Sequence, residues 1–174
     1  MKTTIIRLSF FSVIYLASFV GAIAQQTDYK YHSIFIYNFT KYLQWPAANS
    51  SGDFVIGIVG NSPIVSELEK MASSKTVGSR KIVVKRFAGA DEIAPCQMLF
   101  VPHNQNRYLA EITAKARKSS ILVITESPGL AHKGSNINFV IKENKWRFEL
   151  NKKATDEANI KVSQELLSLS IPVE

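Results

Sequence analysis

The polar residues best placed for chemistry follow directly after apolar runs that read as strands. They are Gly60-Asn61-Ser62, His103-Asn104 and Thr125-Glu126. If the strands are parallel, these residues meet at the carboxyl edge of the sheet, where α/β domains bind ligands. Gly60-Asn61-Ser62 also precedes a predicted helix, whose free N–H groups suit an anion. Two interpretations stay open. The residues are ordinary turns, or they form a ligand crevice made of Gly60, Asn61, Ser62, His103, Asn104, Thr125 and Glu126.

The sequence lacks the short motifs of common enzymes. It contains no Gly-x-Ser-x-Gly turn, no phosphate loop ending in Gly-Lys-Ser/Thr and no His-Glu-x-x-His helix. His32, His103 and His132 fall in different predicted elements without the spacing of metal ligands. These motifs therefore indicate no catalytic residue, metal site or cofactor, and the histidines are expected to be exposed or hydrogen-bonded.

Cys96 is the single cysteine, so an intramolecular disulfide is impossible. Pro95 precedes it and an apolar run, 98–101, follows it, which predicts the start of a buried strand. An inert core thiol is the favoured interpretation. A reactive thiol or an intermolecular disulfide stays open as the alternative.

An aromatic stretch, 29–46, is predicted to be the first helix of the fold. Its periodic residues fall at i, i+3, i+4, i+7, i+8 and i+11, namely Tyr31, Ile34, Phe35, Asn38, Phe39 and Tyr42. Trp45-Pro46 ends the pattern, because proline disfavours the α conformation of the residue before it. We expect the face that carries Tyr31, Phe35, Phe39 and Tyr42 to be buried on the sheet.

Other aromatic residues of this stretch lie off the buried face. Tyrosine and tryptophan at partly exposed positions are typical anchors of protein interfaces. Core packing is the competing explanation for them. The predicted partner-binding residues are Tyr37, Lys41, Trp45 and Pro46.

The first 24 residues predict a signal peptide. Lys2 and Arg7 precede an apolar run, Leu8 to Val20, and Ala22-Ile23-Ala24 is a small-x-small cleavage site. A retained anchor is the alternative, but the run is shorter than the roughly 20 residues that a spanning helix needs. We therefore expect an exported protein without stable membrane insertion, in which 25–174 form one domain.

The chain is basic, with a formal net charge of +7 over 174 residues. The charge remains positive after loss of the signal peptide, and its lysines and arginines are scattered along the chain. An exported protein with this pattern is not expected to bind nucleic acid. A modest positive surface suits anionic envelope material or an acidic partner.

Strand-like and helical segments alternate after residue 52. Runs rich in β-branched residues predict buried strands at 53–59, 81–87, 97–101 and 120–124, and helical spacing predicts helices at 63–72 and 104–117. Short connections in this alternation indicate an α/β fold with a mostly parallel sheet and helices on both faces.

The last third of the chain changes character. Segments 136–141 and 145–150 alternate between apolar and polar residues, and Glu143-Asn144 between them is a turn signal. They predict an antiparallel hairpin at the edge of the sheet. Asn151 and Ser163 are expected to cap two short helices, with Leu166, Leu167 and Leu169 of the second facing inward.

The segment Ile36 to Pro46, Ile-Tyr-Asn-Phe-Thr-Lys-Tyr-Leu-Gln-Trp-Pro, resembles the YNFAKYVEWP opening of the YfiR-like family of bacterial periplasmic proteins. Further segments agree in order, so the likeness covers nearly all of the mature chain. They are 54–60, 79–84, 96–101, 121–125, 134–139 and 147–151. The first motif is specific, and the others resemble strands of many proteins.

The resemblance implies a non-enzymatic, dimeric periplasmic regulator. Such a protein binds the periplasmic domain of an inner-membrane sensor, a diguanylate cyclase or a histidine kinase. It represses the cyclase, and its release raises cyclic di-GMP and favours biofilm formation. This chain keeps Cys96 but lacks further cysteines, so redox control by intramolecular disulfides does not carry over. A small periplasmic ligand-binding protein that uses the strand-end crevice is the alternative, and a hydrolase comes third.

Overall fold

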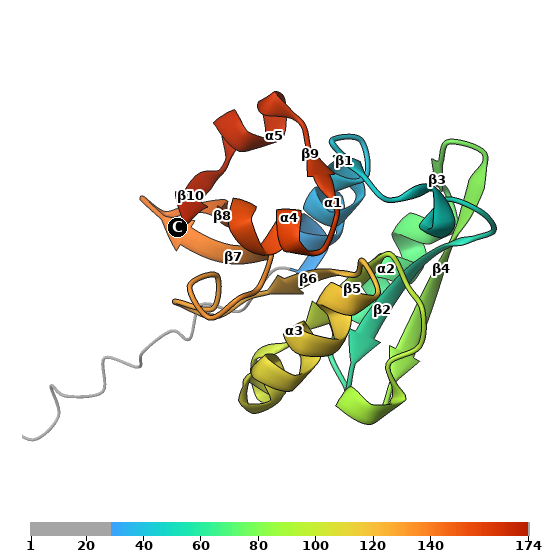
Figure 1. Ribbon diagram of the computed structural model, residues 1–174, viewed down its shortest axis with the longest axis horizontal. Helices are drawn as coiled ribbons and strands as arrows, with labels where there is room; N and C mark the ends of the chain where they lie inside the picture. Colours follow the sequence, from blue (N-terminus) through green and yellow to red (C-terminus); the bar gives the residue numbers. More distant parts are fainter. Residues whose placement is uncertain (1–28, 174) are drawn as a thin grey trace, which may run out of the picture.

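The computed structural model describes residues 29–173 (Figure 1). The predicted signal peptide, 1–24, lies outside this range. The helices are α1 Tyr29–Phe39, α2 Ile64–Ala72, α3 Leu109–Lys118, α4 Lys152–Glu157 and α5 Gln164–Leu169, with short 3-10 helices at Ala47–Asn49, Ala90–Glu92 and His103–Tyr108. The strands are β1 Leu43–Gln44, β2 Phe54–Val59, β3 Thr76–Val77, β4 Arg80–Phe87, β5 Met98–Val101, β6 Leu122–Thr125, β7 Ile137–Lys142, β8 Lys145–Asn151, β9 Lys161–Val162 and β10 Ile171–Val173.

The main sheet has eight strands in the order β10-β8-β7-β6-β5-β2-β4-β3. Neighbouring strands are parallel except for the β3–β4 and β7–β8 pairs. The predicted α/β fold with a mostly parallel sheet is confirmed. After β2, the chain adds β4 on one side and then β5 on the other, so the strand order reverses between β2 and β5. The carboxyl ends of these two strands therefore border the place where such sheets bind ligands.

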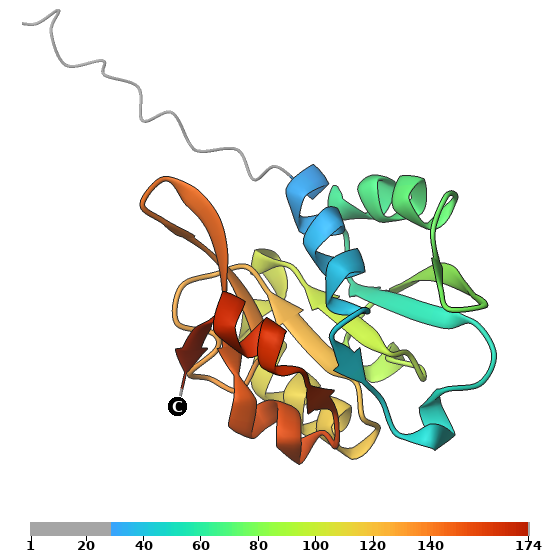
Figure 2. The ribbon, with the colours of Figure 1, turned by 90° about the horizontal axis from the view of Figure 1, so that it is seen from above.

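Helices cover both faces of the sheet, as predicted. Figure 2 shows α1 (blue) and α2 (green) on one side of the strands and α3 (yellow) on the other. Side chains of β5 alternate between two separate cores: Met98 and Phe100 pack on the α1 side, and Leu99 and Val101 pack on the α3 side. This alternation of buried residues explains why the central strands read as continuous apolar runs.

The β7–β8 hairpin is antiparallel, as predicted, and the cap predictions at Asn151 and Ser163 are confirmed by hydrogen bonds to the N–H groups of Ala154 and Leu166. The predicted position of the hairpin at the sheet edge needs a correction. The short strand β10 pairs in parallel with β8 and forms that edge. No strand is predicted there, because the three residues around Pro172 have no strand pattern.

The buried face of α1 differs from the prediction. Tyr31 and Ile34 are 50% and 47% exposed, whereas His32, Ser33, Ile36 and Phe39 are buried. The helix is rotated by about one residue because His32, at i−4 from Ile36, stacks on an aromatic ring of the sheet. Asn38 is half-buried and accepts a hydrogen bond from Lys41 Nζ. The inward prediction for Leu169 is also wrong, since it is 54% exposed.

The described helices include none that combines the length and the hydropathy required to cross a bilayer.

Candidate functional site

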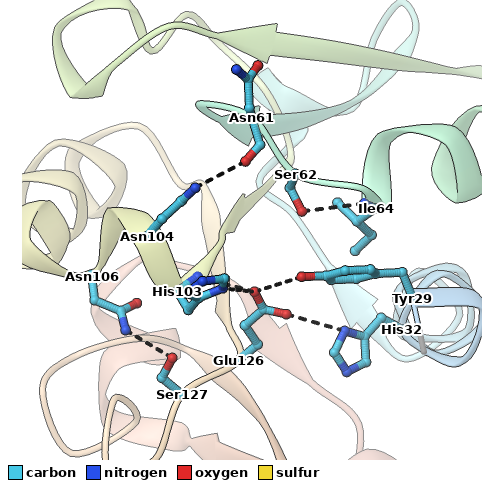
Figure 3. A network of polar contacts seen from close by, with 10 residues as sticks. All are labelled: Tyr29, His32, Asn61, Ser62, Ile64, His103, Asn104, Asn106, Glu126 and Ser127. Carbon is cyan, nitrogen blue, oxygen red and sulfur yellow. Dashed lines mark hydrogen bonds and ion pairs between the residues drawn. The ribbon is translucent and has the colours of Figure 1, made fainter. Parts of the chain in front are cut away.

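The predicted crevice residues meet in part at the carboxyl edge of the sheet (Figure 3). Asn104 Nδ2 donates to the Asn61 carbonyl at 3.3 Å, which joins the end of β2 to the segment after β5. The His103 N–H donates to Glu126 Oε1 at 3.1 Å, which joins the same segment to the end of β6. The topology thus brings three strand ends together, as expected for parallel strands.

Glu126 is the centre of this network. Its side chain is only 4% exposed, although it is a carboxyl group at a strand end. Oε1 accepts hydrogen bonds from the Tyr29 hydroxyl at 3.2 Å and from the His103 N–H. Oε2 is buried and has no hydrogen-bond partner. Burial raises the pKa of this carboxyl, and the bonds from His103 and Tyr29 counteract the rise.

His32 lies next to the unpartnered oxygen of Glu126. Its Nδ1 is 3.7 Å from Oε2, too far for a hydrogen bond, and both ring nitrogens lack partners. The ring stacks on Phe139 with centroids 4.0 Å apart, and Trp146 meets it edge-on at 4.7 Å. Burial lowers the pKa of His32 to about 4. The expectation that every histidine is exposed or hydrogen-bonded is therefore wrong for His32.

Glu126 also lines a pocket of about 520 Å³. It lies between the segment after β6 and the β7–β8 hairpin. Its wall is mostly apolar and carries two carboxyl groups and one amine, and its lining residues are Glu126, Pro128, Gly129, Phe139, Val140, Ile141, Lys142, Trp146, Glu149 and Ile171. Glu126 is thus shared by the strand-end network and the pocket.

The remaining crevice residues have local structural partners. Gly60 adopts a φ of +71° and its N–H donates to the Phe87 carbonyl at 2.7 Å, so it is a turn residue. Ser62 Oγ accepts from the Ile64 N–H at 3.4 Å, which uses one N–H at the start of α2. Thr125 is fully buried, and its hydroxyl contacts Ser135 and Asn138 in the interior. Thr125 therefore does not face a crevice.

The predicted partner-binding residues form two groups. Tyr37 and Lys41 lie on α1 and just after it. Lys41 is exposed and holds its Nζ 4.9 Å from the centre of the Tyr37 ring. The half-buried Tyr37 packs against the core cluster of that face. This group is a mixed cationic and aromatic surface next to Lys75, whose Nζ lies 5.8 Å from the same ring.

Trp45 and Pro46 form the second group, at the amino end of the sheet. Trp45 Nε1 donates to the Gln97 carbonyl at 3.0 Å, and its ring meets Phe54 edge-on. Trp45 therefore also has a structural role. Both residues border a groove of about 510 Å³, whose other lining residues are Gln44, Ala47, Asp156, Asn159, Ile160 and Lys161.

Cys96 is buried and unpaired, as the sequence predicts. Burial raises the pKa of its thiol to about 12, which keeps it protonated. A protonated thiol is a poor nucleophile.

Several residues of the site were missed in the sequence analysis. Tyr29, Trp146 and Glu149 come from α1 and from the hairpin, far in sequence from the strand ends. His32 had a usable signal, because it shares helical spacing with the apolar Ile36 and Phe39. Across residues 29–173, no cluster of three or more histidine, cysteine or acidic side chains has the arrangement of a metal site.

Comparison with known proteins decides the family. The family model described as DUF4154, YfiR/HmsC-like, matches residues 29–171, which is almost all of the described chain. The chain belongs to the YfiR/HmsC-like family. This family is regulatory and non-catalytic, and it is periplasmic. A search of curated proteins gives no match for this YfiR/HmsC-like chain.

Solved structures support the fold of this YfiR/HmsC-like protein. One is the crystal structure of an ABC domain from Streptococcus pneumonia in complex with L-Trp. It has 13% sequence identity and a TM-score of 0.50, and the match covers 70% of this chain and 55% of that chain. The chain thus spans about half the length of that protein. At this identity the likeness shows a shared α/β fold alone.

Proposed function

We propose that this protein is a periplasmic regulator that binds the periplasmic domain of an inner-membrane sensor, a diguanylate cyclase or a histidine kinase. By repressing or modulating that sensor, it affects cyclic di-GMP signalling and biofilm formation. The observation that carries the proposal is the family match over residues 29–171. The predicted signal peptide supports the location, because it would deliver the mature chain to the compartment that holds such sensor domains.

The proposed mechanism is linkage between binding and the state of the sensor. A regulator that binds the inactive state more tightly shifts the sensor toward that state by the difference in binding free energy. No chemical step is needed. A tenfold difference in affinity for the two states of the sensor corresponds to about 1.4 kcal/mol, so a few contacts suffice to shift the sensor between them.

The proposed contact surface includes Tyr37, Lys41, Trp45 and Pro46. Tyr31 and Ile34 extend the surface along α1, because they are large apolar side chains that the fold leaves exposed. Exposed apolar side chains next to a cation are typical of interfaces. We also propose a homodimer as the functional unit.

The proposal is tested by capture from envelope extract. The mature protein is immobilised, retained membrane proteins are identified, and cyclic di-GMP is measured in cells with and without the gene. We expect retention of a sensor protein and higher cyclic di-GMP without the gene. Tyr37→Ala and Lys41→Glu should weaken retention, while Lys118→Glu on the exposed end of α3 is the matched control.

Trp45 needs a more careful variant, because its indole bonds to Gln97. Trp45→Ala removes both the surface and this bond, whereas Trp45→Phe removes the bond and keeps an aromatic side chain. If retention of the sensor falls for Trp45→Ala but not for Trp45→Phe, the loss is due to the missing aromatic surface and not to the missing hydrogen bond. The regulatory function is contradicted if the wild-type protein retains no membrane protein and if cyclic di-GMP is the same in cells with and without the gene.

A small-ligand-binding protein is the second candidate function. It is favoured by the buried carboxyl of Glu126 beside a pocket of about 520 Å³. A rise in melting temperature with a small molecule, without retention of a membrane protein, would favour this candidate over the regulator.

A further inference from the structure

We propose that the pocket between the segment after β6 and the β7–β8 hairpin binds a small organic amine, with its ammonium group at Glu126 and Glu149 and its apolar body against Trp146 and Phe139. This inference goes beyond the proposed regulatory function and does not depend on it.

The unpartnered oxygen of Glu126 is the first observation. A buried carboxylate oxygen without a hydrogen bond is unfavourable, because it has lost its bonds to water and gained none in the protein. Among the described residues, Tyr29 and His103 satisfy Oε1, and none satisfies Oε2. His32 is the nearest candidate donor, and its Nδ1 remains 3.7 Å away. Because Oε2 is buried, a ligand with an N–H donor supplies the missing bond only when the side chains that cover this oxygen move aside.

The charges of the pocket indicate a cationic donor. Its lining contains two carboxyl groups, those of Glu126 and Glu149, and one amine, that of Lys142. Glu149 is fixed in place, because its Oε2 accepts a hydrogen bond from Asn138 Nδ2 at 2.8 Å. Lys142 is exposed at the end of β7, where its ammonium group is solvated. An ammonium group therefore gains two carboxyl partners, and a carboxylate ligand would meet two like charges.

The wall of the pocket indicates an apolar body. The lining includes five large apolar side chains, Phe139, Val140, Ile141, Trp146 and Ile171, of which Phe139 is almost fully buried. Ile141 is 40% exposed, so part of its apolar side chain faces solvent at the wall of the pocket. Trp146 also presents an aromatic ring to the same space, and such rings attract cations over their faces. A ligand that combines a cation with an apolar or aromatic body matches all of these groups.

The volume of the pocket sets the size of the ligand. Drug-sized molecules occupy pockets of about 300–1,000 Å³, so a cavity of about 520 Å³ holds a molecule of one or two rings. We therefore choose phenethylamine as the probe. Its matched comparisons are 3-phenylpropionate, which reverses the charge, and 3-phenylpropanamide, which removes it.

Intrinsic fluorescence measures binding at Trp146. The chain contains two tryptophans, Trp45 and Trp146, so the Trp45→Phe variant of the mature protein leaves Trp146 as the reporter. We expect phenethylamine to change its emission in a saturable way near neutral pH. The neutral amide should bind roughly tenfold more weakly or worse, because it lacks the charge-assisted hydrogen bonds. The anion should bind more weakly still.

Two exposed positions test the charge without touching the buried network. Ile141→Lys adds a cation to the pocket wall and should weaken binding of phenethylamine, whereas Lys142→Glu removes one and should strengthen it. Glu126→Gln should weaken binding roughly tenfold. Melting curves of each variant show whether the fold is retained, and the two exposed variants keep the test valid if Glu126→Gln does not fold.

The outcomes separate this inference from the regulatory function. Absence of saturable binding at millimolar phenethylamine overturns the inference, as does equal or tighter binding of the anion. Binding that is unchanged by Ile141→Lys and Lys142→Glu also overturns it, because the site would then lie elsewhere. Retention of a membrane sensor does not bear on any of these results.

Discussion

Glu126 and His32 are two buried ionisable side chains that face each other below the strand ends. Burial raises the pKa of the carboxyl and lowers the pKa of the imidazole. Both shifts favour the neutral form inside the protein, because the low-dielectric interior disfavours charge. The aromatic rings of Phe139 and Trp146 around His32 exclude the water that would stabilise an imidazolium.

The free energy of unfolding should depend on pH through His32. The pKa of His32 falls from 6.5 to about 4 in the folded protein, so the unfolded chain binds a proton first as the pH drops. The stabilisation that His32 gives is present above pH 6.5 and is lost progressively toward pH 4, by about 3 kcal/mol at most. Glu126 acts in the opposite direction, because its raised pKa favours the folded state on acidification.

We expect the variant His32→Phe to lose less stability than the wild type between about pH 7 and pH 4.5. Phenylalanine keeps the stacking on Phe139 and cannot bind a proton. Urea unfolding at a series of pH values measures the difference between the two proteins. His132→Phe, at an exposed histidine that has no ion pair with Glu126, is the control and should follow the wild-type curve. Parallel curves for His32→Phe and wild type would contradict the prediction.

At the scale of elements, the β7–β8 hairpin depends on an unusual turn. Glu143 and Asn144 both have positive φ, 53° and 58°, and connect paired Lys142 and Lys145. This is the backbone of a two-residue type I′ turn, which matches the twist of the strands. Glutamate adopts positive φ unfavourably, so the turn carries local strain. The hairpin also forms one wall of the pocket, and the turn thus helps to position the wall.

Replacing the turn by Asn-Gly should stabilise the protein. The double variant Glu143→Asn, Asn144→Gly should raise the free energy of unfolding by about 1 kcal/mol, because both residues then accept positive φ. Asn144→Val should lower it by about 1–2 kcal/mol. The urea midpoint measures both changes, and Lys118→Ala on α3 is a neutral reference. A destabilised Asn-Gly variant would show that Glu143 or Asn144 makes a contact that matters more than its backbone.

Helix α1 shows how tertiary packing selects a face. Its periodic residues allow either of two neighbouring faces to be buried, and the predicted face was the one that carries Tyr31. The sheet offers Phe139, Phe100 and Trp146 at the position of His32, and stacking there decides the rotation of the helix. The face with Tyr31 and Ile34 is left exposed as a consequence, and it extends the proposed partner surface.

At the scale of the whole molecule, the predicted signal peptide would determine where the protein acts. We expect the mature chain to begin at Gln25, after cleavage at Ala22-Ile23-Ala24. Expression of the full chain in a bacterium, followed by fractionation and intact mass measurement, tests this start. Ala24→Phe should block processing, and Ala24→Ser should leave it unchanged, since the site requires small residues. A periplasmic protein that retains residues 1–24 would contradict the prediction.

The sequence by itself determined the fold class, most strand and helix positions, the caps at Asn151 and Ser163, and the burial of Cys96. These follow from local spacing, turn residues and apolar runs, which act within a few residues of each other. The motif at 36–46 also indicated the family, which the match over 29–171 establishes.

Only the tertiary structure decided what surrounds Glu126. Its partners Tyr29 and His103 lie 97 and 23 residues away in sequence, and the pocket beside it is completed by the hairpin. The burial of His32, the outward turn of Tyr31 and the edge position of β10 depend in the same way on which elements meet. Such contacts produce no periodic pattern in the sequence. They form between elements whose own residue patterns are satisfied whichever neighbours they meet. The position of the strand ends alone indicated Glu126 as a candidate crevice residue, whereas the burial of its carboxyl group and the apolar wall beside it depend on the complete fold.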